Sequence, residues 1–163
     1  MYRFCLSFCH FFFLFIKRRS YDIVFYYPQH FNRGKNSQNY FFEHYYEVCK
    51  KKNLSYIVFE EPYNGASRNK ESIPFDFVFF IIVLLRKLFR NQNFIEKDKR
   101  IGRLLAFSIF RNIDFKNFIV LSKSMLSVFS AIQPCCRIFD NQHGIIYPKK
   151  SDYFNDDLVS SHL

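Results

Sequence analysis

The chain has 163 residues, a length at which one domain with a substantial core is expected. It is 49% hydrophobic and carries 24 Phe and 11 Tyr but only 4 Gly. The sequence contains neither the motif GxGxxG nor the motif GxxxxGK followed by Ser or Thr. Their absence excludes a self-contained glycine-rich site for a dinucleotide or ATP, so we predict no cofactor. The net charge of +10 favours anionic partners such as lipid headgroups, nucleotides, phosphosugars or nucleic acid, although a solvated basic face would have the same composition.

The first twenty residues raise the question of a membrane segment. Residues 4–16 are an apolar run that would span about 20 Å as a helix, whereas a bilayer's hydrocarbon core is roughly 30 Å thick. The cationic residues 17–19 follow this run, and no small-residue cleavage site appears, so the pattern differs from a secretory signal. We interpret residues 1–20 as a separate segment, either a peripheral membrane anchor or a buried leading element. An extension upstream of the true start is a third interpretation.

The cysteines indicate the redox setting. They are five in number and form no CxxC pair, which is typical of reduced thiols in a cytosolic protein. Cys5, Cys9 and His10 lie in the first apolar run without a second pair of ligands, so we predict no metal site.

Strand and helix patterns alternate from residue 21 onward. Residues 21–27 are mostly apolar on both faces and stop at Pro28, as a buried parallel strand does. Apolar positions at helical spacing predict a helix over residues 36–52, with a run of Lys at its end. A second strand is expected over residues 54–62, followed by a polar loop.

The second half continues the alternation. Residues 75–89 predict a helix, since Pro74 precedes it, an acid lies near its start and two basic residues lie near its end. Residues 77–85 are apolar all round, so this helix is either fully buried or dips into a membrane. The remaining expected elements are a helix over 96–110, a strand over 117–122, a helix over 124–132 and a strand over 136–140.

This order of elements predicts an α/β fold. We expect a Rossmann-like three-layer domain over residues 21–150, with a mostly parallel sheet of about four strands and helices on both faces. Ligands of open α/β sheets bind beyond the carboxyl ends of the strands. The polar residues that follow the expected strands are Gln29 and His30, Glu60 and Glu61, Ser122, and Asn141, Gln142 and His143.

The stretch FDNQHGIIYP, residues 139–148, holds the strongest candidate in this set. His143 is a plausible general base, because a histidine pKa of about 6.5 leaves a large neutral fraction near neutral pH. Gly144 would let the backbone turn sharply or approach a ligand closely. In the alternative interpretation, Asn141 and Gln142 only close a turn and His143 bonds a backbone carbonyl.

A strand that ends in QHG, followed by an apolar pair and Tyr, resembles the motif of bacterial surface-polysaccharide glycosyltransferases and glycerophosphotransferases with two Rossmann domains (GT-B type). YDIVFYYPQHFNRGKN is similar to the first strand and acceptor-side loop of such proteins. The resemblance covers residues 21–153 and implies transfer of a sugar or polyol phosphate from a nucleotide-activated donor to a glycan acceptor. It implies that His143 is the base or a phosphate contact.

The other site residues have weaker grounds. Gln142, Gly144, Asn141, His30 and Gln29 are expected to bind substrate, and Glu61 is a second catalytic candidate, chosen like His30 from sheet topology. The second domain that holds the donor in this family is missing from the chain, and residues 151–163 look like a polar tail. We therefore expect an acceptor-side half that is truncated or split and inactive alone, cytoplasmic or peripheral on the inner face of the membrane.

Two other classes compete with this interpretation. A non-catalytic, basic, membrane-peripheral protein would use the Phe-rich N-terminus and the helix over residues 75–89 as anchors on an anionic surface. A nucleic-acid binder would explain the sequence pI of about 9.5. We rank it third, because most aromatic residues lie inside apolar runs where they cannot stack on bases.

Overall fold

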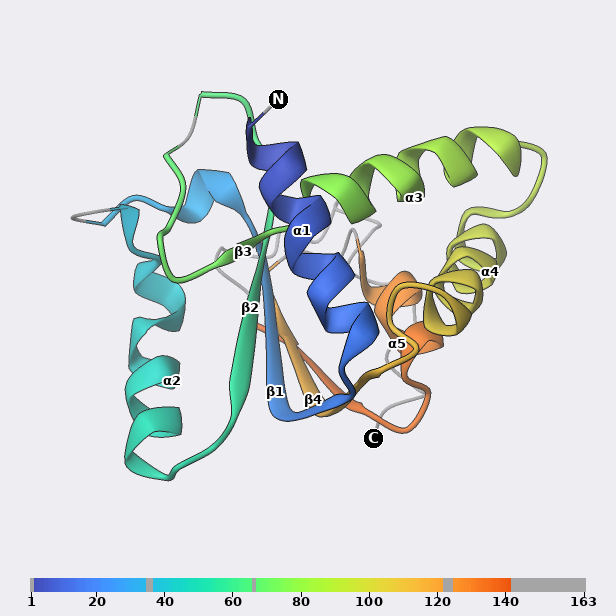
Figure 1. The fold of residues 1–163 in the computed structure, drawn as a ribbon. Coiled ribbons are helices and arrows are strands. Elements are labelled where there is room, and N and C mark those ends of the chain that lie inside the picture. Colours follow the sequence, from blue (N-terminus) through green and yellow to red (C-terminus); the bar gives the residue numbers. More distant parts are fainter. Residues whose placement is uncertain (1, 35–36, 66, 122–124, 142–163) are drawn as a thin grey trace, which may run out of the picture.

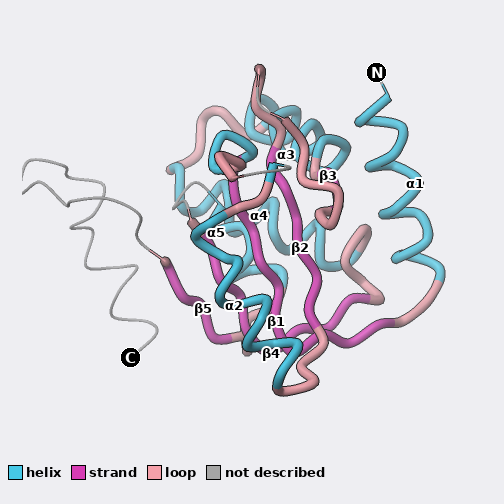
Figure 2. Tube along the Cα trace, turned by 90° about the vertical axis from the view of Figure 1, so that its left-hand side faces the viewer, coloured by secondary structure: helices cyan, strands magenta, loops and turns pink. Residues whose placement is uncertain are grey.

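A single parallel sheet organises the computed structural model, which describes residues 2–34, 37–65, 67–121 and 125–141. Five strands lie in the order β3-β2-β1-β4-β5, and each neighbouring pair is parallel. The strands are β1 (Arg19–Pro28), β2 (Tyr56–Glu61), β3 (Ile73–Pro74), β4 (Ile113–Val120) and β5 (Arg137–Asp140). The predicted Rossmann-like α/β class is confirmed (Figures 1 and 2). The strand beyond the expected number is β3, whose two residues are too few to show a pattern.

Four helices agree with the predicted ones to within a few residues. They are α2 (Tyr40–Lys51), α3 (Asp76–Leu88), α4 (Phe94–Phe107) and α5 (Leu126–Ile132). The sequence did not predict the helix α1 (Tyr2–Ile16) or the short 3-10 helix η1 (Gln29–Phe31) after β1. Asn39 and Asn93 cap α2 and α4, since each side chain accepts a hydrogen bond of 3.0 Å from a backbone N–H two residues on. The Asn93 cap explains why α4 starts at Phe94, two residues before the predicted start.

Alternate side chains of the central strand enter two separate cores. Val24 and Tyr26 of β1 pack in the larger core, against residues of α1, α3, α4 and α5. Phe25 and Tyr27 point the other way and pack against α2. The sheet is therefore the middle of three layers: among the described helices, α2 covers one face, and α1, α3, α4 and α5 cover the opposite face (Figure 1).

The N-terminal segment is a helix that packs on the rest of the fold. Phe11 and Leu14 of α1 are buried in the larger core, and Arg19 is already the first residue of β1. Ser7 fixes the helix to its neighbours, because its hydroxyl donates to the carbonyl of Pro74 at 2.6 Å and accepts from the amide of Phe77 at 3.0 Å. One side of α1 is thus buried, as expected of a leading element, while its other side is exposed.

The helix α3 differs from its predicted environment. Val78 and Ile82 are buried, but Phe80, Leu84 and Leu88 are exposed, so of the two alternatives for this helix the fully buried one is wrong. The reason is that α3 lies at the surface of the helical layer and contacts the core along one side only. Within the described residues, no helix is both long and apolar enough to cross a bilayer.

Candidate functional site at the carboxyl edge of the sheet

The strand ends that were predicted to carry a ligand site meet at one edge of the sheet, which we call the carboxyl edge. It comprises the last residues of β1, β2, β4 and β5 together with the described residues that follow them, and all of these strands are parallel. The first strand lies between β2 and β4, so the chain changes direction along the sheet at β1, which is where open α/β sheets form ligand crevices. The predicted Ser122, Gln142, His143 and Gly144 lie outside the described residues.

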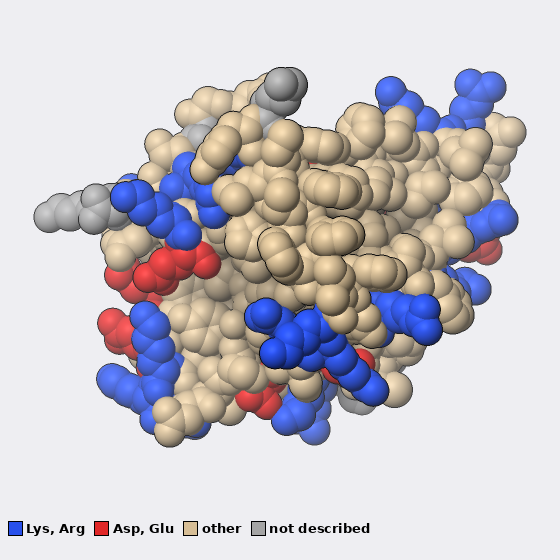
Figure 3. Space-filling model, in the orientation of Figure 1, with Lys and Arg blue, Asp and Glu red and all other residues tan. Residues whose placement is uncertain are grey.

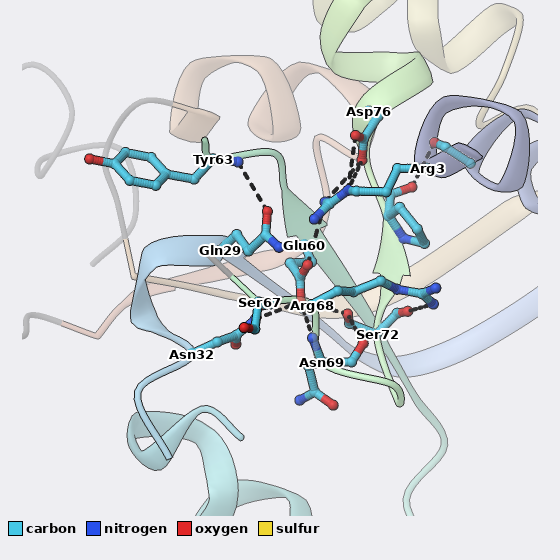
Figure 4. Close-up of polar contacts among 12 residues, drawn as sticks. Arg3, Gln29, Asn32, Glu60, Tyr63, Ser67, Arg68, Asn69, Ser72 and Asp76 are labelled. Atoms are coloured by element: carbon cyan, nitrogen blue, oxygen red, sulfur yellow. Dashed lines mark hydrogen bonds and ion pairs between the residues drawn. The ribbon is translucent and has the colours of Figure 1, made fainter. Parts of the chain in front are cut away.

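Gln29 and Asn141 are placed by contacts with the strand ends. Gln29 is only 2% exposed, and its side-chain oxygen accepts a hydrogen bond of 3.2 Å from the amide of Tyr63. It therefore holds the loop after β2 against the end of β1 (Figure 4). Asn141 is half-buried. Its backbone N–H donates a hydrogen bond of 2.8 Å to the carbonyl of Val120, which extends the pairing of β5 with β4 to the edge.

His30 lies between two aromatic rings at this edge. Its imidazole is half-buried, with ring centroids 4.2 Å from Phe31 and 4.8 Å from Tyr63. Tyr63 is 55% exposed, so an aromatic surface opens to solvent directly beside a polar ring. Such a pair can contact both the apolar face and the hydroxyl groups of a sugar or polyol. Tyr63 was missed in the sequence, where it looked like one residue of a polar loop.

Glu61 is half-buried and pairs with a side chain of the central strand. The phenol of Tyr26 donates a hydrogen bond to its carboxylate. Burial raises the pKa of Glu61, while the hydrogen bond from Tyr26 and the positive charge of Arg86 each oppose that rise. Burial, and then the charge of Glu61, raise the pKa of Tyr26 well above its usual value. Glu61 therefore holds a proton to higher pH than an ordinary glutamate, which suits a group that exchanges a proton with a hydroxyl.

Arg86 is the positive charge behind this pair. Its guanidinium forms a bidentate ion pair with Asp98, with Nε 2.9 Å from Oδ1 and Nη2 2.6 Å from Oδ2. Asp98 is fully buried in α4, so this ion pair joins α3 to α4. The sequence indicated Arg86 only as a positive charge near the end of a helix. Its neighbours in the sequence do not indicate a contact with Asp98 on the next helix.

Glu60 accepts several hydrogen bonds at this edge. Its side chain is 0% exposed, and one oxygen accepts hydrogen bonds from Asn32 at 2.9 Å and from the amide of Asn69 at 3.0 Å. The same oxygen accepts from the hydroxyl of Ser72 at 2.8 Å. These partners come from the loop after β1 and the loop before β3 (Figure 4). Glu60 therefore fastens two loops to the end of β2 through this one oxygen, while its other oxygen accepts no hydrogen bond within the described residues.

Arg3 brings the start of α1 into the same cluster. Its Nη2 lies 3.4 Å from the other oxygen of Glu60, and its guanidinium also contacts both oxygens of Asp76 at the start of α3, the shortest distances being 3.1 Å. The cluster thus joins two helices to the carboxyl edge (Figure 4). The sequence showed Glu60 as a polar residue at a strand end but did not show partners that lie far away along the chain.

A cavity of about 360 Å³ opens elsewhere, between α1, β1 and the outer side of β2. His10, Tyr21 and Glu71 are among its lining residues, and no residue of the candidate site is. Burial, and then the charge of Arg68, lower the pKa of His10. Among the described residues, no three His, Cys, Asp or Glu side chains gather as metal ligands.

Comparisons of this chain with models of protein families, with curated proteins and with solved structures gave no match.

Proposed function

We propose that this chain is the acceptor-side, Rossmann-like half of a transferase that adds a sugar or polyol phosphate from a nucleotide-activated donor to a glycan of the bacterial cell envelope. One observation carries the proposal: the change of direction at β1 coincides with an imidazole beside an exposed tyrosine and near the end of the strand that bears Glu61. The sequence resemblance of residues 21–153 to such transferases supports it. A Rossmann-like sheet alone would fit many other activities.

Four residues at the carboxyl edge have distinct roles in this proposal. Tyr63 supplies an aromatic surface for the apolar face of the acceptor, and His30 contacts a hydroxyl or phosphate group beside it. Glu61, whose pKa burial raises, exchanges a proton with an acceptor hydroxyl. Gln29 holds the loop that carries Tyr63 in place. The role of His143 as base or phosphate contact stays a prediction, because that residue lies outside the described part of the chain.

The test is a titration of the full chain, followed by NMR, with short hexose oligomers, glycerol-phosphate oligomers, a nucleoside diphosphate sugar and CDP-glycerol. We expect one of the two acceptor-type oligomers to shift the amide resonances of residues 29–31 and 63. His30→Ala should weaken that binding about tenfold, the value of one hydrogen bond at the upper end of its range. His44→Ala, which removes an exposed histidine of α2, is the matched control and should leave the affinity unchanged.

Two outcomes would contradict this proposal. One is that neither oligomer binds. The other is that binding perturbs the cavity lined by His10 and Glu71 instead of the carboxyl edge. Turnover is not expected in this experiment, because the proposal assigns the donor to a second Rossmann-like domain.

The proposal includes a location, at the inner face of a membrane. The net charge of +10 supports it, since an anionic leaflet attracts basic proteins. The second candidate function is a membrane-peripheral protein without catalysis. The exposed aromatic residues of α1 favour that candidate specifically. Absence of resonance shifts in the acceptor titration, together with binding to vesicles, would distinguish it from the transferase.

A further inference from the structure

The outward side of α1 is apolar although it faces solvent. Phe4, Phe8, Phe12, Phe15 and Ile16 are all exposed, with Phe12 at 52%. Arg3 is the one charged residue of the helix, and it points into the cluster around Glu60. A helix that is apolar on every side is normally covered on every side. Only one side of α1 is covered by the described residues, so its outward side has the character of a contact surface.

The helix α3 extends this surface. The ring of Phe4 packs edge-on against Phe77 and Phe80, with centroid distances of 5.7 and 5.8 Å. Leu84, one turn after Phe80, is also exposed. We call the outward side of the two helices the aromatic face, and it consists of Phe4, Phe8, Phe12, Phe15, Ile16, Phe77, Phe80 and Leu84. It appears in Figure 3 as an expanse without blue or red atoms over α1 and the adjoining part of α3.

A groove runs into the aromatic face between α1 and the segment after α4. It has a volume of about 180 Å³ and is lined by Phe8, Phe11, Phe12, Phe15, Phe77, Ser108 and Ile109. Six of these seven side chains are apolar, so the groove suits a hydrocarbon chain better than a polar ligand.

Basic residues border the aromatic face at two ends. Lys17, Arg18 and Arg19 follow α1 directly, and Lys87 and Arg90 lie at and beyond the end of α3. All five are exposed. In Figure 3, blue atoms gather near the lower end of α1 and beyond the outer end of α3. A flat apolar area with cations around it complements a surface of hydrocarbon with anionic headgroups.

We propose that the aromatic face docks on an anionic lipid bilayer, with α1 lying in the plane of the interface and the basic residues on the headgroups. The inference rests on the location given in the proposed function and identifies the surface and the partner. The 15 residues of α1 are about 22 Å long, less than the roughly 30 Å hydrocarbon core, so the helix lies along the bilayer rather than across it. An interfacial helix enters by about 5–10 Å, a depth that aromatic side chains reach.

The docking surface and the carboxyl edge adjoin without sharing side chains. Arg3, at the start of α1, contacts Glu60 at the edge, whereas the outward residues of α1 point away from the sheet. The helix α2 lies on the opposite face of the sheet and stays away from the bilayer in this arrangement. Variants of one surface should therefore leave the other unchanged.

The test is flotation of the full chain with vesicles of phosphatidylcholine alone and of phosphatidylcholine mixed with phosphatidylglycerol. We expect the chain to float with the mixed vesicles and to bind those of phosphatidylcholine alone only weakly. Phe12→Ser should reduce partitioning about tenfold, because one large apolar side chain no longer inserts. Phe139→Ser is the matched control, since Phe139 is 49% exposed on β5 at the far side of the sheet, and it should leave binding unchanged.

A second pair of variants tests the basic border. Lys17→Gln should weaken binding to mixed vesicles about fivefold, as expected for one cation near an anionic surface. Lys50→Gln on α2 is its control and should have no effect. Far-UV circular dichroism and thermal melts of all four variants should match the parent chain, because each replaced side chain is exposed.

Three outcomes would overturn the inference. They are absence of flotation by the parent chain, equal binding to both kinds of vesicle, and equal losses in Phe12→Ser and Phe139→Ser. The parent chain could instead fail to bind vesicles, sediment as a dimer, and become monomeric when it carries Phe12→Ser. That result would assign the aromatic face to a second copy of the chain. His30→Ala should float like the parent, so failure of the acceptor titration and failure of membrane docking are seen separately.

Discussion

Glu60 and Glu61 are neighbours at the end of β2, but they face opposite sides of the sheet and have opposite surroundings. Glu60 is fully buried among donors from two loops and lies 3.4 Å from the guanidinium of Arg3. Glu61 accepts a hydrogen bond from the phenol of Tyr26, and burial raises the pKa of Glu61. Two residues of the same type, adjacent in sequence, therefore have different parts in the molecule.

The surroundings of the two side chains separate a structural carboxylate from a functional one at a strand end. A buried carboxylate that is surrounded by donors from several segments holds those segments together. A partly exposed carboxylate whose pKa burial raises binds a proton more readily than an ordinary glutamate and can exchange it. We assign the first part to Glu60 and propose the second for Glu61, and three experiments test that distinction.

The largest effect is expected for Glu60→Ala. It leaves the donors of Asn32, Asn69 and Ser72 without their shared acceptor and Arg3 without one of its partners, so the free energy of unfolding should fall by about 3–5 kcal/mol. Urea denaturation measures this loss. Glu60→Gln keeps an oxygen in place and should cost about half as much. A loss below about 1 kcal/mol for the alanine variant would show that the cluster does not hold the loops.

A smaller effect is expected for Arg3→Ala. It removes the guanidinium that joins α1 to Glu60 and Asp76, and because that side chain is partly exposed the loss should be about 1–2 kcal/mol. Arg18→Ala is the matched control, since the pair of Arg18 with Asp114 is largely exposed and should contribute less than about 0.5 kcal/mol. Equal losses in the two variants would argue that Arg3 has no special part in fixing α1.

The smallest effect concerns the pH dependence of stability at Glu61. The folded pKa of this carboxyl is raised above its unfolded value, so the folded state binds more protons between the two pKa values. Stability should therefore fall as pH rises from the ordinary glutamate pKa toward the raised one, by about 1.4 kcal/mol for each unit of difference. Glu61→Gln should flatten this slope while keeping an acceptor for Tyr26. An unchanged slope in the variant would show that a group other than Glu61 causes the pH dependence.

Local patterns predicted the element types and failed where a partner lies far along the chain. The apolar run of residues 21–27 and the periodic residues of α2 predicted their elements because strand and helix periods are properties of a short segment. The start of β4 at Ile113, four residues before its predicted start, depends on pairing with Arg19. The exposed side of α3 could not be predicted either, because its sequence is apolar all round and does not show which side meets the core.

The candidate site was predicted in part for the same reason. His30 and Glu61 were chosen because parallel strands place their carboxyl ends together, and the structure brings both to one edge. Tyr63 and Arg86 were missed, since the ring contact with His30 and the charge near Glu61 come from segments more than 20 residues away. The residues of the QHG motif lie outside the described part of the chain, so their place at this edge stays a prediction.

The amino-acid sequence was enough to predict the class of fold, because alternating strand and helix patterns allow little other than a parallel sheet with helices on its faces. It also determined the excess of positive charge and the absence of a glycine-rich nucleotide loop. Only the tertiary contacts show which of two adjacent glutamates accepts hydrogen bonds from two loops and which side of an apolar helix faces solvent. Both depend on contacts between segments distant in the chain, and no local pattern records them.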